Sequence, residues 1–169
     1  MRATGPTAIA TCLAVLAIGL PAMADDVDDF VENRDKALAL GPEGRALFTK
    51  TAEGFSASLD AMTTSVDAFY DTAQRQPLGP DEGAALQKLE FRRDLGEFLL
   101  AEAYATFART FAEGDAAREN YAEQALERYD DFTQDRGSAS LLLQAYLDRG
   151  ELLIRLKRTE EAIEEYQEL

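Results

Sequence analysis

The side chains that could perform chemistry in this chain are almost all carboxylates. The 169 residues include 32 Asp and Glu but no His and no Trp, and the one cysteine, Cys12, lies in an apolar N-terminal segment. Once that segment is removed, thiol and histidine catalysis, disulfides and metal sites with thiolate or imidazole ligands are all excluded. The chemistry that remains open is a carboxylate pair, as in glycosidases, or a metal site with oxygen ligands alone.

The spacing of the acidic residues favours neither kind of site. A cluster of aspartates follows the apolar segment, at Asp25, Asp26, Asp28 and Asp29, but it lacks the Asp-x-Asp-x-Asp-Gly loop and distal Glu of a calcium site. A carboxylate-bridged di-iron bundle needs Glu-x-x-His, which is impossible without histidine. We interpret the cluster as stabilising a helix N-terminus. We expect no catalysis, no metal and no cofactor.

Residues 1–24 have the pattern of a secretory signal peptide. Arg2 gives a positive start, residues 8–20 are an apolar run, and residues 22–24 form a small-x-small cleavage site. The run of about 13 residues is too short for a membrane span, which needs about 20. Lipidation of Cys12 is the alternative, although this cysteine follows a threonine and comes too early. We expect an exported protein, periplasmic or extracellular, without stable membrane insertion.

The net charge of the chain indicates what kind of partner it could bind. The whole chain has a formal net charge of −15, and removal of Arg2 with the leader leaves 16 basic against 32 acidic residues. Such a chain repels nucleic acid and anionic lipid surfaces. About 145 residues remain after cleavage, enough for one domain with a core. A protein or peptide partner of basic or mixed charge fits this balance best.

The apolar residues of the mature chain recur at helical spacing, which predicts an all-α fold. A first helix ends at Gly41-Pro42. From Phe48 to Ala73 apolar residues then alternate at spacings of four and three, which predicts a long helix over 43–75 with one narrow apolar seam. We favour packing of this seam within the chain, with self-association as the alternative.

A second long helix is predicted to begin at Pro80, because residues 76–80 contain two prolines and a glycine and acids follow them. Its apolar residues, from Leu86 to Phe111, are numerous enough to lie along the first seam. The two segments therefore predict a long antiparallel helical hairpin. Gly96 and the charged residues 92–94, expected to be exposed, predict a kink or a break in the second helix.

The second half of the chain contains an internal similarity. Residues 122–129 align with residues 159–166 at an offset of 37, and each segment is preceded by a helix with large residues around a small one. Small residues at such positions allow two helices to approach closely. The positions that define the pattern are Tyr104, Phe107, Ala108, Phe111, Ala125, Tyr129, Tyr146, Gly150, Leu153, Ala162 and Tyr166.

This pattern resembles the tetratricopeptide repeat family over about residues 101–169. The resemblance implies a hairpin over 25–100 leading into an α-solenoid, with a generic helical bundle as the alternative. Two departures from the family are about five extra residues between Ala108 and Ala125 and a missing proline after the first repeat. The sequence stops inside the last repeat, so either it is a fragment of a longer repeat protein, which we favour, or the last helix docks elsewhere.

In that family, residues of the first helices line a concave face that binds proteins or peptides. Carried over to this sequence, these positions are Glu102, Ala105, Arg109, Glu113, Gln144, Leu147, Glu151, Ile154 and Arg155. The resemblance thus implies an exported protein-interaction scaffold. A structural or oligomerising role for the helix over 43–75 is the alternative, and a carboxylate-dependent enzyme is a third hypothesis.

The leader generates the first testable prediction. Fusion of residues 1–24 to a reporter should direct its secretion, and the secreted protein should begin at Asp25 because cleavage follows Ala24. N-terminal sequencing of the native protein checks this. A first residue at Met1, or a lipid-modified Cys12, would contradict it.

Overall fold

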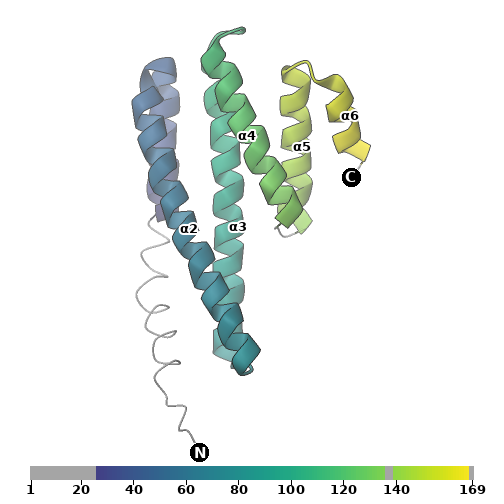
Figure 1. Ribbon diagram of the computed structural model, residues 1–169. Coiled ribbons are helices and arrows are strands. Elements are labelled where there is room, and N and C mark those ends of the chain that lie inside the picture. Colours follow the sequence, from purple (N-terminus) through teal and green to yellow (C-terminus); the bar gives the residue numbers. More distant parts are fainter. Residues whose placement is uncertain (1–25, 136–138, 168–169) are drawn as a thin grey trace, which may run out of the picture.

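The helix-breaking residues of the sequence fix where the helices begin and end. A computed structural model describes residues 26–135 and 139–167, and the regular structure of these residues is entirely helical (Figure 1), which confirms the all-α class. The elements are a helix over 26–40, a 3-10 helix η1 (Gly41–Gly44), α2 (Arg45–Arg75), α3 (Pro80–Ala108), α4 (Ala116–Asp135), α5 (Ala139–Arg155) and α6 (Thr159–Gln167). The predicted signal peptide and the last two residues lie outside the described residues.

The helices pack in sequential pairs. The helix over 26–40 lies against α2, where the rings of Phe30 and Phe55 stack with centroids 4.0 Å apart. α3 packs mainly on α4, and α5 packs mainly on α6. α3 also contacts α2 on one side and α5 on the other, so it is the central helix of the array (Figure 1).

The position of α3 explains its composition. Its C-terminal half is buried at Leu100, Ala101, Ala103, Tyr104, Ala105, Phe107 and Ala108. A helix with neighbours on several sides is apolar around most of its circumference rather than along one stripe. Four of these residues are alanines, which let the neighbouring helices approach closely.

The seam predicted on the long helix is buried. α2 begins at Arg45 and ends at Arg75, and its buried residues are Phe48, Ala52, Phe55, Leu59, Met62, Val66 and Phe69. These are the residues at which the alternating spacing placed the seam. They belong to one buried apolar cluster that also contains residues of α3, α4, α5 and α6.

The structure corrects the prediction of a kink or break at Gly96. α3 is one continuous helix through this residue. A Cβ on Gly96 would lie 2.5 Å from Cδ2 of Leu59, so the glycine makes room for α2. The charged residues nearby are not fully exposed either, because Asp94 is buried and accepts hydrogen bonds from the Arg93 guanidinium at 2.7 and 3.0 Å.

The boundary predicted between residues 100 and 101 falls inside α3. The same helix therefore belongs both to the predicted hairpin and to the first predicted repeat. α3 ends at Ala108, so Phe111 lies beyond the helix, although its side chain is still buried.

Two glycines of the N-terminal helices give a matched prediction. A Cβ at Gly44 would lie 2.2 Å from the carbonyl oxygen of Ala37, which is backbone and cannot rotate away, whereas a Cβ at Gly54 would meet nothing within 4 Å. Gly44→Ala should therefore destabilise the protein by about 1–3 kcal/mol. Gly54→Ala, in the middle of α2, should stabilise it by about 0.5–1 kcal/mol.

Urea denaturation of the two variants and the wild type checks this pair. Both substitutions add one methyl group. If Gly44→Ala lowers the free energy of unfolding and Gly54→Ala raises it, the loss is due to the close approach of Gly44 to Ala37. Equal effects of both substitutions would show that the helix over 26–40 does not pack as closely as described.

Candidate functional site

The predicted repeat-core residues lie mainly in the interior. Nine of the eleven are buried, namely Tyr104, Phe107, Ala108, Phe111, Ala125, Tyr129, Gly150, Leu153 and Ala162. Tyr146 is half-buried, and Tyr166 is 38% exposed. Tyr166 nevertheless covers Gly150, since a Cβ added to Gly150 would lie 2.6 Å from the Tyr166 ring. Gly150 thus marks a close approach of α5 and α6, as the sequence pattern predicted.

The predicted partner-binding residues do not all share one surface. Ala105 is buried, at 3% exposure, and therefore cannot line an open face. Glu113 was expected on a helix, but it lies in the connection between α3 and α4, where its carboxylate is 3.1 Å from Nζ of Lys157. The extra residues noted in the sequence form this connection, which includes Gly114 at a positive φ of 83°.

The remaining charged residues do come together on α3 and α5. Burial raises the pKa of Asp148 of α5, while a hydrogen bond from Gln144 and the positive charge of Arg109, at the end of α3, oppose this rise. The guanidinium of Arg155 donates to Glu151 and is the main reason that the pKa of Glu151 is lowered, and the charge of Arg109 adds a smaller effect in the same direction.

The charges of the same residues also act on Tyr129 of α4, which is buried. Burial raises the pKa of its hydroxyl strongly, and the carboxylates of Asp148 and Glu102 raise it further. Glu102 also lies 3.8 Å from Arg34 of the helix over 26–40. We call the surface that carries Glu102 and Arg109 on α3 and Gln144, Asp148, Glu151 and Arg155 on α5 the α3–α5 face.

On α5 the predicted residues separate into two neighbouring stripes. Positions 144, 148, 151 and 155 follow helical spacing and form the charged stripe of the α3–α5 face. Leu147 and Ile154 belong to an adjacent stripe with Leu143, and all three are at least 40% exposed. The polar and apolar parts of the predicted groove thus point in different directions around the helix.

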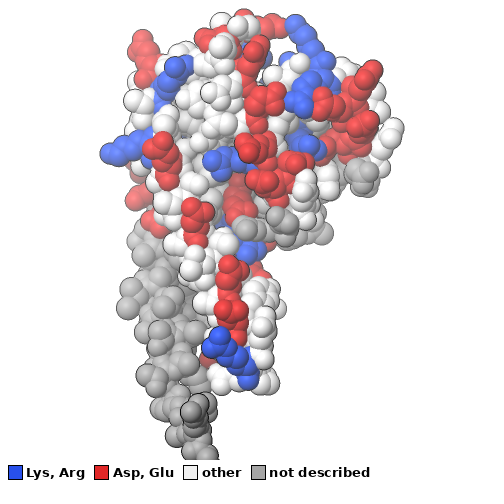
Figure 2. All heavy atoms as spheres, viewed as in Figure 1, with Lys and Arg blue, Asp and Glu red and all other residues white. Residues whose placement is uncertain are grey.

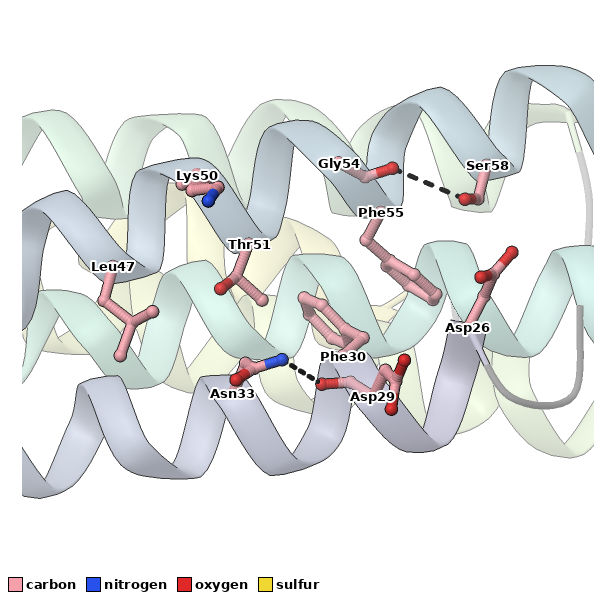
Figure 3. Close-up of a pocket in the computed structure, with 10 residues that line it drawn as sticks. All are labelled: Asp26, Asp29, Phe30, Asn33, Leu47, Lys50, Thr51, Gly54, Phe55 and Ser58. Atoms are coloured by element: carbon pink, nitrogen blue, oxygen red, sulfur yellow. Dashed lines mark hydrogen bonds between the residues drawn. The ribbon is translucent and has the colours of Figure 1, made fainter.

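Cavities also lie away from this face. One, of about 290 Å³, opens between the helix over 26–40 and α2, with the stacked rings of Phe30 and Phe55 between Asp29 and Lys50 on its rims (Figure 3). Another, of about 610 Å³, lies between α2 and the first turns of α4, beside Tyr104 and Tyr121. A third, of about 460 Å³, lies between α4 and α5, beside Asp130 and Arg149. Sequence patterns identified none of these cavities, because each depends on how two or more helices pack.

The turn between α5 and α6 has a defined C-cap geometry. The backbone N–H of Arg158 donates to the carbonyl of Leu153 at 2.9 Å, and that of Lys157 donates to Ile154 at 3.0 Å. These are the two bonds of a Schellman motif, with Lys157 at a positive φ of 64°. This turn brings α6 back onto α5.

Two arginines then connect α6 to α4. Arg149 of α5 donates to the buried Glu165 of α6 and lies 3.1 Å from Asp130 of α4. Arg158 bonds Glu123 of α4 at 3.0 Å and also bonds Glu161 of α6. Of these pairs, Arg158 with Glu161 has a spacing that could be recognised in the sequence, whereas the others depend on the fold.

The described residues contain no group of three or more His, Cys, Asp or Glu side chains placed to hold a metal ion. Among the helices of the same part of the chain, none is long and apolar enough to cross a membrane. Comparisons with known protein families, with curated proteins and with solved structures found no match.

The bridge at Arg149 gives a stability prediction. Arg149→Met should destabilise the protein by about 2–4 kcal/mol, because it leaves the carboxylate of Glu165 buried without its cation. Arg149→Met combined with Glu165→Met should recover most of the loss, since neither charge then remains. The free energy of unfolding in urea checks both values.

Glu151→Gln is the control. It breaks an ion pair with Arg155 on the surface of α5, which should contribute less than about 0.5 kcal/mol. If Arg149→Met were as neutral as Glu151→Gln, the bridge would not hold α6 in place.

Proposed function

We propose that this protein is an exported interaction scaffold without catalytic activity, which binds a partner protein or peptide through the α3–α5 face. The observation that carries the proposal is that α3 and α5 are in contact and carry Glu102, Arg109, Asp148 and Glu151, none of which is buried and whose charges act on one another's surroundings. Such a surface can bind a partner with complementary charges, and it contains none of the thiol or imidazole groups of most catalytic sites.

A tetratricopeptide-like arrangement is the second part of the proposal. The pairing of α3 with α4 and of α5 with α6, the burial of Ala108 and the close approach at Gly150 support it. The helix over 26–40 and α2 form a further pair upstream, and the 3.8 Å contact between Arg34 and Glu102 brings that pair beside α3. We therefore propose three stacked helical pairs, one more than the two predicted from the sequence.

The charge of the molecule supports a partner of basic or mixed charge. The chain carries a net charge of −15, and Figure 2 shows acidic side chains gathered over α4 and α6 on the face in view. Long-range attraction of a basic partner would raise its association rate, and this effect weakens as salt shortens the Debye length from about 10 Å at 0.1 M to about 3 Å at 1 M.

The test is capture of partners from the envelope fraction of the source organism by the protein without residues 1–24. Asp148→Lys combined with Glu151→Lys should lower recovery of the specific partner at least about tenfold, because these changes reverse two charges in the centre of the α3–α5 face. The fold of the variant is checked by circular dichroism and by its urea midpoint.

The matched control is Asp60→Lys combined with Asp67→Lys, the same change in charge at two exposed positions of α2. This control should keep full recovery. Equal capture by the wild type and both variants would place the binding surface elsewhere, and equal losses in both variants would show only a general effect of net charge.

A further inference from the structure

α5 and α6 carry an exposed apolar surface in the part of the chain that the structure describes. Leu143, Leu147 and Ile154 lie on one stripe of α5 and are 51%, 40% and 49% exposed. Gly150 lies in the same stripe, and Tyr166 of α6 covers it. With Ile163, one turn before Tyr166 and 52% exposed, the surface contains five large apolar side chains. We call it the apolar end patch.

Comparison with α3 indicates what shape of ligand fits this patch. The register that matches Ala108 with Gly150 also matches Ala101 with Leu143 and Ala105 with Leu147. On α3 these three positions are at most 3% exposed, because neighbouring helices pack against α3 there. On α5, Leu143 and Leu147 are exposed and larger than the corresponding alanines, whereas Gly150 is covered by Tyr166. The patch therefore presents the surface that a further helix would cover.

The polar residues around the patch are mainly acidic. Asp148 and Glu151 border it on α5, and the exposed Glu160 and Glu164 border it on α6. Two cations lie within three residues of Ile154 in the sequence, and both are already paired, Arg155 with Glu151 and Lys157 with Glu113. A second copy of the chain would bring the same acidic border and a net charge of −15, so the two copies would repel each other.

We infer that the apolar end patch binds an amphipathic helix of a partner protein, with aliphatic side chains on one face and Lys or Arg along its edges. Leu147, Ile154 and Tyr166 would contact the apolar face, and the acidic border would contact the basic edges. This inference rests on the proposed role as an interaction scaffold. The patch shares Asp148 and Glu151 with the α3–α5 face, but its apolar contacts lie on a separate stripe of α5 and on α6.

The experiment uses a fluorescent synthetic peptide of 18 residues, composed of Leu and Lys so that one helical face is apolar and both edges are basic. Fluorescence anisotropy should show saturable binding to the protein without residues 1–24. Leu147→Asp combined with Ile154→Asp should weaken the affinity at least about tenfold, because two central apolar contacts are lost. A scrambled peptide of the same composition should bind weakly, since it cannot form an apolar face.

The control variant is Leu40→Asp combined with Phe91→Asp, which makes the same kind of change at apolar residues that are 53% and 51% exposed elsewhere. It should bind the peptide like the wild type. Equal binding by all three proteins, or equal binding of the scrambled peptide, would overturn the inference, because attraction to the acidic chain alone would explain the result.

Sedimentation of the protein without peptide tests whether a second copy of the chain occupies the patch instead. A wild-type dimer that becomes monomeric in the Leu147→Asp, Ile154→Asp variant would overturn the inference in favour of a second copy. Failure of the Asp148 and Glu151 variant to change partner capture would refute the role of the α3–α5 face, yet it would leave the peptide result intact. The two proposals can therefore fail separately.

Discussion

The stacking of Phe48 on Phe107 fixes the relative positions of the central helices. Their ring centroids are 4.1 Å apart and their planes are nearly parallel, at 3°. Tyr121 of α4 meets both rings edge-on, at 5.7 and 5.0 Å, so one cluster joins α2, α3 and α4. Phe111 stacks on Tyr121 and thereby holds the start of the connection that follows α3. Aromatic pairs of this geometry contribute beyond the area they bury, by about 0.5–1.5 kcal/mol each.

Local features of the sequence were sufficient to predict most helix boundaries. Pro80 begins α3 because its missing N–H would be unpaired at the first turn in any case. The seam from Phe48 to Phe69 was predictable because its spacing depends only on the geometry of a single helix. Gly150 was predictable because a small residue between large ones in a helix indicates a close approach.

Features that depend on the distance between helices were not predictable in this way. Gly96 was interpreted as a weak point of its own helix, whereas its role is to accommodate Leu59 from another helix. The predicted binding residues do not share one surface, because Ala105 is buried and Glu113 lies beyond the end of α3. The residues on α5 form two stripes, because positions 147 and 154 point to a different side of the helix from positions 144, 151 and 155. The bridges from Arg149 join residues up to 19 positions apart, Asp130 and Glu165 among them, and an acidic chain offers many equally plausible pairings.

The sequential packing of the helices has a consequence for folding kinetics. Except for the contact of α3 with α5, the main contacts join helices that are consecutive in the chain. Proteins dominated by such local contacts fold within microseconds to milliseconds, because little loop-closure entropy opposes each step. The helices nevertheless share one buried apolar cluster, so they should unfold as a cooperative unit. α6 contacts mainly α5, and we therefore expect it to open locally before the other helices do.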